Sequence, residues 1–197
     1  MKSLKKPSLR KINNVLSLIV VVLAAYILIW PFLPDIRWRL GHVSKQSSPA
    51  QLTAKVDAVK PKSIPADNTL VIPRIDVSLQ IHEGQSNTTL EKGAWRRPKT
   101  STPDSGGNTV IVGHRFNYSA TGTFYHLDKV QVGDPIVVYW QGREYAYIVA
   151  SSSVVPASQI SVEDNTKEPQ LTLYTCTPIW SFKDRLVVVA KPWKEKP

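Results

Sequence analysis

The feature that constrains this chain most is an uncharged apolar run near its N-terminus. Residues 15–33 read VLSLIVVVLAAYILIWPFL, without a single charged side chain. At about 1.5 Å per residue, a helix of that length just crosses the hydrocarbon core of a bilayer, which is about 30 Å thick. A cleaved signal peptide would instead have an apolar region of about 7–15 residues followed by a small-residue cleavage site. We therefore expect an uncleaved transmembrane anchor over residues 15–34.

The formal net charge of +10 is concentrated beside this run. Residues 1–60 hold ten Lys and Arg against two acidic residues, whereas residues 61–197 hold fifteen against thirteen. By the positive-inside rule, the cations before the run predict a cytoplasmic tail over residues 1–14 and an extracellular position for everything after the anchor. The nearly neutral remainder lacks a basic stripe, which argues against nucleic acid as a partner. The cations before the run are Lys2, Lys5, Lys6, Arg10 and Lys11.

Beyond the anchor, the chain divides into a polar segment and a segment of short apolar runs. Residues 35–67 contain Ser, Gln, Lys and Pro without a sustained apolar period, so they predict an extracellular stalk. Residues 68–194 alternate runs of β-branched and aromatic residues with turn residues, which predicts an all-β barrel or sandwich with one helical turn near 123–127. The runs of strand length are 69–75, 77–81, 109–112, 135–140, 145–155, 170–175 and 185–191.

The single cysteine, Cys176, is the candidate nucleophile. It ends the predicted strand LTLYTC, in which alternation places Leu171 and Leu173 on one face and Cys176 on the other. If the leucines fill the core, the thiol faces outward. One Cys excludes an intramolecular disulfide, and with four scattered His it is too few for a structural zinc site. An exported thiol without a partner is open to oxidation, and catalysis supplies a reason for its presence.

His114 and Arg185 are the residues that could act together with this thiol. His114 closes an apolar run after Gly113, which lets the backbone bend where the strand ends. A histidine and a cysteine supply the base and the nucleophile of acyl transfer. Arg185 opens the last apolar run and could stabilise a developing oxyanion. Taken singly, a strand-end His or Arg is more often an ordinary surface residue, so the hypothesis depends on the coincidence of all three.

These motifs resemble those of the sortases, the membrane-anchored cysteine transpeptidases of bacterial surfaces. Residues 172–176, TLYTC, are similar to the TLxTC signature of the family, and Arg185 follows the cysteine by nine positions, as in several sortase classes. His114 lies in VGHR, which is similar to the strand-terminal histidine of the family, and residues 72–77, IPRIDV, also resemble it. The resemblance covers residues 68–193, and the anchor and the stalk fit it as well.

The resemblance implies an all-β fold: an eight-stranded sortase-like barrel with one or two short helices, preceded by a transmembrane helix. His114, Cys176 and Arg185 would share one groove. Cys176 would attack the Thr–Gly carbonyl of an LPxTG-like sorting motif and form an acyl-thioester. His114 would protonate the leaving amine and then deprotonate the incoming amine, and Arg185 would hold the substrate or the oxyanion. Thr175 and Thr177 would line the substrate site.

The implied partners are secreted proteins with a C-terminal sorting motif, an amine acceptor such as a peptidoglycan precursor or a pilin, and the membrane around the anchor. Water could replace the amine, which would make the enzyme a thiol protease of the hydrolase class. No cofactor is implied, and no acidic cluster could be matched to the calcium site known in part of the family. The sequence has a short loop after Thr-Cys-Thr-Pro and lacks a lid motif. In these two features it most resembles sortase classes D and E.

Three other hypotheses fit an exported protein with a single cysteine. Cell-wall L,D-transpeptidases carry their cysteine in a Ser-x-Gly-Cys turn, which this chain lacks. Papain-like peptidases have their cysteine before their histidine, whereas this chain runs His114, Cys176, Arg185. A non-catalytic membrane-anchored binding or scaffold domain remains the alternative, and the presence of all three candidate catalytic residues argues against it.

Overall fold

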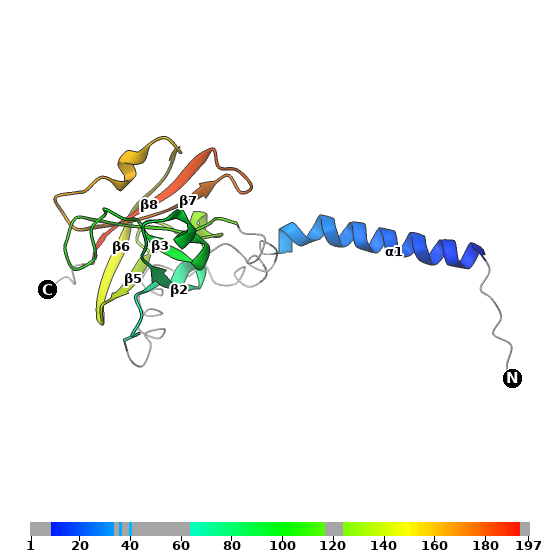
Figure 1. The fold of residues 1–197 in the computed structure, drawn as a ribbon, viewed down its shortest axis with the longest axis horizontal. Helices are drawn as coiled ribbons and strands as arrows, with labels where there is room; N and C mark the ends of the chain where they lie inside the picture. Colours follow the sequence, from blue (N-terminus) through cyan, green and yellow to red (C-terminus); the bar gives the residue numbers. More distant parts are fainter. Residues whose placement is uncertain (1–8, 34–35, 37–39, 41–63, 117–123, 194–197) are drawn as a thin grey trace. The chain divides into compact units, whose positions relative to one another are not determined.

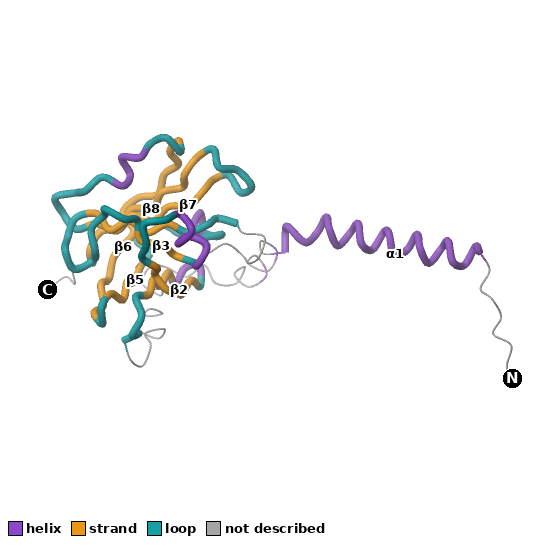
Figure 2. Tube along the Cα trace, in the orientation of Figure 1, coloured by secondary structure: helices purple, strands orange, loops and turns teal. Residues whose placement is uncertain are grey.

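The computed structural model describes residues 9–33, 36, 40, 64–116 and 124–193. These fall into two units, within residues 1–46 and 47–197. Among the described residues, the first unit contains a long α-helix, and the second contains eight strands joined by loops and short 3-10 helices (Figures 1 and 2). Most of the predicted stalk over 35–67 and part of the predicted tail over 1–14 lie outside the described residues.

The helix α1, Leu9–Ile29, is the element that the apolar run predicts. By length and composition it can span a membrane, and none of its side chains is buried. The helix begins before the apolar run and includes Arg10 and Lys11. It gives way to a 3-10 turn, η1, Trp30–Phe32, because Pro31 lacks the N–H that would continue the α-helical hydrogen bonds.

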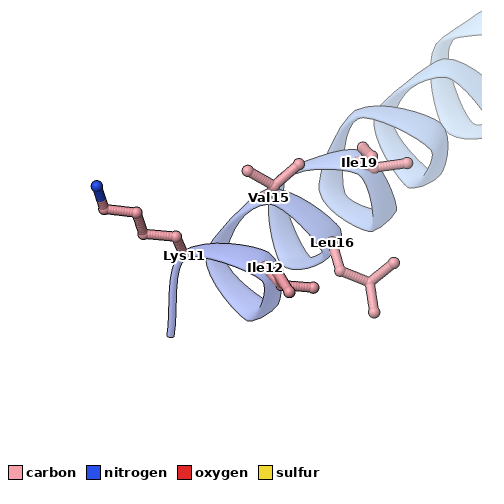
Figure 3. A pocket seen from close by; sticks show the side chains of 5 residues that line it. All are labelled: Lys11, Ile12, Val15, Leu16 and Ile19. Atoms are coloured by element: carbon pink, nitrogen blue, oxygen red, sulfur yellow. The ribbon is translucent and has the colours of Figure 1, made fainter. Parts of the chain in front are cut away.

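The start of α1 combines an apolar stripe with a lysine. Near its start, Ile12, Val15, Leu16 and Ile19 follow one another at a spacing of three and four residues, so they form an apolar stripe. Figure 3 shows the side chain of Lys11 extending away from these apolar side chains. A lysine at this end can keep its ammonium in the polar headgroup region while the stripe lies in hydrocarbon.

The strands of the second unit close into a barrel, as predicted (Figure 1). Their order around the barrel is β1-β2-β3-β4-β7-β8-β6-β5, with parallel pairing between β2 and β3 and between β4 and β7. Closure pairs every strand on both sides, which leaves no sheet edge open. The strands are β1 Thr69–Ile72, β2 Val77–His82, β3 Ala94–Arg96, β4 Asn108–Val112, β5 Pro135–Trp140, β6 Arg143–Pro156, β7 Gln170–Thr177 and β8 Asp184–Pro192.

Seven of these strands lie where the apolar runs predict them, and β3 does not. With three residues it is too short to show alternation, and it depends on distant partners: Trp95 pairs with His82 in β2 and with Val112 in β4. The predicted helical turn near 123–127 corresponds to η4, Leu127–Lys129. This 3-10 helix begins at the last residue of the predicted range. The other short helices of this unit are η2 Pro73–Ile75, η3 Asn87–Lys92 and η5 Ile160–Glu163.

Two groups of apolar side chains cover the two faces of the sheet around β4 and β7. Leu171 and Leu173 point into the barrel, where they join the main core. Tyr174 points the other way. We call its group the outer cluster: Trp95, Val110, Val112, Tyr174 and Val187. The alternation predicted along β7 is therefore present in the structure.

A buried ion pair fixes the turn that precedes β5. Asp134 has no exposed surface, and its carboxylate accepts hydrogen bonds from Arg74 at 2.8 Å (Nε) and 2.6 Å (Nη2). The same carboxylate accepts the backbone N–H of Gln131 at 2.8 Å. The pKa of Arg74 is raised by its hydrogen bond to Asp134, so the guanidinium stays charged. The pair joins η2 to the turn before β5.

We expect Asp134→Ala to lower the free energy of unfolding by about 3–5 kcal/mol, because the change removes the buried carboxylate that pairs with the Arg74 guanidinium. Denaturant unfolding of the detergent-solubilised chain, followed by near-UV circular dichroism, measures this. The control Glu168→Ala removes an exposed carboxylate and should change stability by less than about 0.5 kcal/mol. Equal effects of the two substitutions would contradict the expectation.

Candidate active site

Strand pairing brings the three predicted catalytic residues to one end of the outer face, which is the side of the sheet that carries the outer cluster. Cys176 and Arg185 lie directly opposite each other in the antiparallel pair of β7 and β8, so their side chains share a face. In the parallel pair of β4 and β7, Val112 lies beside Tyr174. The N–H of Gly113 then donates to the Tyr174 carbonyl at 3.3 Å, which carries the ladder one step further toward His114. Alternation from Val112 and Tyr174 puts His114 and Cys176 on the same face.

The three side chains are all partly exposed. Cys176 is a free thiol, and the side chain of His114 is 26% exposed. The guanidinium of Arg185 donates from Nη1 to the carbonyl oxygens of Phe182 and Asp184, each at 3.0 Å. These two bonds tie Arg185 to the loop between β7 and β8. The site therefore combines an accessible thiol with a cation held at a defined place.

The loop between β7 and β8 closes one side of this site. It begins with a cis peptide bond between Thr177 and Pro178, and Ser181 N–H donates back to the Pro178 carbonyl at 3.0 Å. Trp180 adopts a φ of 71°, which bulky residues rarely do. Its ring lies 3.8 Å, centroid to centroid, from that of Phe116, two residues after the histidine. The loop is thus packed against the segment that follows β4.

Thr175 and Thr177, predicted to line the substrate site, differ in their surroundings. Thr175 has no exposed surface, and its hydroxyl donates to the Gly113 carbonyl at 2.7 Å. The alternation that turns Cys176 outward turns Thr175 inward, on the face of Leu173. The hydrogen bond of Thr175 thus holds the backbone at Gly113, and substrate binding by Thr175 stays a prediction. Thr177 is partly exposed, so it can be reached from solvent.

Gly113 sits where no other residue fits without rearrangement. A Cβ at this position would lie 2.9 Å from the ring of Phe124, which is fully buried. The Phe124 N–H in turn donates to the His114 carbonyl at 3.0 Å. Together with the bond from Thr175, these contacts hold the backbone on both sides of the histidine.

A carboxylate at Glu163 holds the connection between β6 and β7 over the outer cluster. It accepts the Tyr174 hydroxyl at 2.6 Å and Arg97 Nε at 2.8 Å. Burial raises the pKa of Tyr174, and the hydrogen bond to Glu163 raises it further, so the phenol remains the donor. The Arg97 guanidinium also lies over the Trp95 ring, 4.4 Å from its centroid. This arrangement pins η5 beside the strand that carries Cys176.

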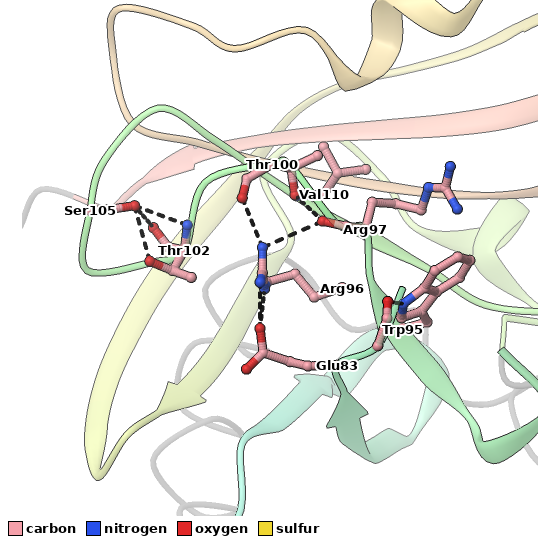
Figure 4. A network of polar contacts seen from close by, with 9 residues as sticks. Glu83, Trp95, Arg96, Arg97, Thr100, Thr102, Ser105 and Val110 are labelled. Atoms are coloured by element: carbon pink, nitrogen blue, oxygen red, sulfur yellow. Dashed lines mark hydrogen bonds and ion pairs between the residues drawn. The ribbon is translucent and has the colours of Figure 1, made fainter. Parts of the chain in front are cut away.

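A second set of polar contacts holds β3 and the loop that follows it (Figure 4). Arg96 forms an ion pair with Glu83, donating from Nε at 2.8 Å and also from Nη2. Its Nη1 donates to the Thr100 carbonyl at 2.8 Å. The indole N–H of Trp95 donates to the Gly84 carbonyl at 3.0 Å. Arg96 and Trp95 thereby fasten one side of the outer cluster to the connection between β2 and β3.

A pocket of about 220 Å³ lies further along the same face. Thr172, which borders it, is four positions before Cys176 in β7, a separation of about 13 Å at strand rise. Asn108 shapes its floor by donating to the carbonyls of Val162 and Asp164 and accepting from Thr172. The lining residues are Asn108, Ser153, Val155, Gln159, Ser161, Val162, Asp164, Asn165, Thr166, Gln170, Thr172, Val187 and Val189.

Glu91 also reaches the site, although the sequence analysis does not identify it. Its Oε1 lies 3.2 Å from Nε2 of His114. The two residues are 23 positions apart and meet only because η3 lies beside the end of β4, so no local motif marks the carboxylate. Among the described residues, no group of three or more His, Cys, Asp or Glu side chains could hold a metal ion.

We expect Thr175→Val to lower the free energy of unfolding by about 1–3 kcal/mol, because the buried Gly113 carbonyl loses its hydroxyl donor while the side-chain shape is kept. The same denaturant titration measures it. Ser153→Ala, which removes an exposed hydroxyl from β6, is the matched control and should leave the midpoint unchanged. A Thr175→Val protein as stable as the control would show that the buried bond contributes nothing.

Comparison with known proteins gives consistent matches. The sortase domain family model matches residues 70–193. The chain is 35% identical to sortase SrtE1 of Streptomyces coelicolor over 144 residues, which is 65% of this chain and 40% of that protein. It is 29% identical to sortase D of Bacillus subtilis over 120 residues, 60% of this chain and 58% of the relative. The chain thus spans about half the length of these curated relatives.

Solved structures show the same likeness. The structure of sortase E1 from Streptomyces coelicolor with a tripeptide in the active site superposes with a TM-score of 0.59 at 32% identity, covering 67% of this chain and 94% of that one. A Clostridium perfringens sortase D5 transpeptidase superposes with a TM-score of 0.58 at 27% identity, covering 76% of this chain and 91% of that one.

Proposed function

The chain belongs to the sortase family, and we propose that it is a cysteine transpeptidase that cleaves sorting motifs and transfers the acyl group to an amine. The observation that carries this proposal is the meeting of Cys176, His114 and Arg185 at one end of the outer face. An accessible thiol, an imidazole and a fixed cation are the groups that acyl transfer through a thioester requires.

In the first half of the proposed reaction, the Cys176 thiolate attacks the Thr–Gly carbonyl of an LPxTG-like motif. Arg185 stabilises the negative charge that develops on the carbonyl oxygen. His114, in its protonated form, gives its proton to the leaving glycine amine as the C–N bond breaks. The products are an acyl-thioester on Cys176 and a released C-terminal peptide.

In the second half, an amine of a cell-wall precursor or a pilin attacks the thioester. His114 takes the proton of this amine, and Cys176 leaves as a thiolate. Water in place of the amine would give hydrolysis. The substrate would lie along the outer face, which also carries the pocket bordered by Thr172.

The likeness to a class E and a class D enzyme supports placement near classes D and E. The N-terminal apolar helix suits a single-pass membrane anchor. We infer that the basic residues before it lie in the cytoplasm and that the barrel lies outside the cell, where secreted substrates and cell-wall acceptors are found. Thr177, partly exposed beside the nucleophile, is the residue we assign to substrate contact.

We expect Cys176→Ala and His114→Ala each to lower kcat/KM for a fluorogenic LPxTG peptide at least about 1,000-fold, because each removes a group that takes part in bond making. Arg185→Ala should cost about 100-fold or more through the lost oxyanion contact. Arg185→Lys should restore only part of this rate, since lysine lacks the planar fork. Unchanged circular dichroism is the folding control, and near-normal turnover by Cys176→Ala would exclude the mechanism.

We expect iodoacetamide to modify Cys176 readily, and a sorting-motif peptide to slow the modification by covering the thiol. Intact-protein mass spectrometry measures both rates. A peptide of the same composition in scrambled order is the control and should give no protection. An unreactive thiol, or equal protection by both peptides, would favour the non-catalytic scaffold.

A further inference from the structure

The contact between His114 and Glu91 is not used by the reaction described above. Glu91 Oε1 lies 3.2 Å from His114 Nε2, a hydrogen-bond distance. The carboxylate is 64% exposed and the imidazole 26% exposed, so the pair lies at the rim of the site. The ring has two nitrogen atoms, and this contact engages one of them.

The main chain that carries Glu91 is held in place from both ends of η3. The hydroxyl of Ser86 accepts the N–H of Thr88 at 3.3 Å where the helix begins, and the N–H of Gly93 donates to the Leu90 carbonyl where it ends. Leu90 packs on the outer cluster. Glu91 therefore projects from a supported turn.

Thr89 adds a further support beneath the same turn. Its side chain is buried and lies against Gly84, where there is no room for a Cβ. The carbonyl of Gly84 accepts the indole N–H of Trp95, which belongs to the outer cluster. The turn is therefore joined to the outer cluster, which also contains Tyr174. The fold thus holds the backbone of Glu91 within side-chain reach of His114.

We propose that Glu91 is a positioning residue that accepts the Nε2–H of His114 and so leaves Nδ1 as the nitrogen that exchanges protons. The role of Glu91 in catalysis rests on the proposed function. A carboxylate that holds one imidazole N–H fixes the tautomer and the orientation of the ring. It also keeps the ring from rotating freely at a site open to water.

The proton balance follows from this assignment. In acylation, Nδ1–H of the imidazolium passes to the leaving amine as the C–N bond breaks, and the neutral ring keeps Nε2–H on Glu91. In deacylation, the Nδ1 lone pair takes the proton of the incoming amine as that amine attacks the thioester and the thiolate leaves. The ring returns to the imidazolium form, and Glu91 neither gains nor loses a proton.

Nuclear magnetic resonance of the full chain in detergent micelles, labelled with ¹⁵N-histidine, tests the assignment without any substrate. Loss of signals in His114→Ala identifies those of His114. We expect the neutral ring to carry its proton on Nε2, with that proton shifted downfield and protected from exchange. Glu91→Ala should abolish the shift and the protection, whereas Glu91→Gln should keep most of both, because the amide oxygen still accepts. A proton on Nδ1, or an Nε2–H signal unchanged in Glu91→Ala, would overturn the proposal.

Steady-state kinetics with the LPxTG peptide give the second measurement. We expect Glu91→Ala to lower kcat about 10-fold with KM changed less than about two-fold, because ring orientation is needed in the chemical step. Glu91→Gln should keep at least about half of kcat, as the retained acceptor predicts. The control Glu168→Ala, an exposed carboxylate between β6 and β7, should leave both constants unchanged.

The two measurements separate the possible failures. If the wild-type chain cleaves no sorting peptide, the proposed function fails, and the resonance experiment still decides the role of Glu91. If the wild-type chain is active and Glu91→Ala keeps its kcat, the positioning role fails while the proposed function stands.

Discussion

The parallel pairing of β4 with β7 is the interaction on which the site depends. Its register sets Val112 beside Tyr174, so the residues that follow β4 and the residues that end β7 emerge at the same edge of the sheet. Because side chains alternate along a strand, a slip of one residue would turn Cys176 into the barrel and an apolar side chain out. The register of one strand pair therefore decides whether an imidazole and a thiol share a surface.

Two ion pairs and the outer cluster keep that surface stiff. Arg97 with Glu163 and Arg96 with Glu83 fasten the connections that flank the outer cluster. A site built on strands and held by such contacts keeps its geometry better than one carried by free loops. The three side chains proposed for acyl transfer thus stand on a rigid part of the sheet.

Local patterns were sufficient to predict the N-terminal apolar helix, seven strands and the outward direction of Cys176, because each depends on the composition or the periodicity of nearby residues. The strand β3 and the residue Glu91 depend on partners far along the chain, so no local pattern indicates them. The interior position of Thr175 could have been predicted, since it continues the alternation of Leu171 and Leu173. The resemblance to the sortases marks Thr175 only as the neighbour of Cys176, whereas the alternation along β7 gives its direction.

The pairing of β4 with β7 also has a consequence for biosynthesis. Asn108 pairs with Gln170, which lies 62 positions later in the chain, so β4 is synthesised long before its partner strand. Contacts between such distant segments form late in folding. A nascent chain that has passed His114, two residues beyond the end of β4, carries the imidazole but no thiol. One that has completed β7 still lacks the arginine of β8. His114, Cys176 and Arg185 therefore come together only after nearly the whole barrel has been synthesised.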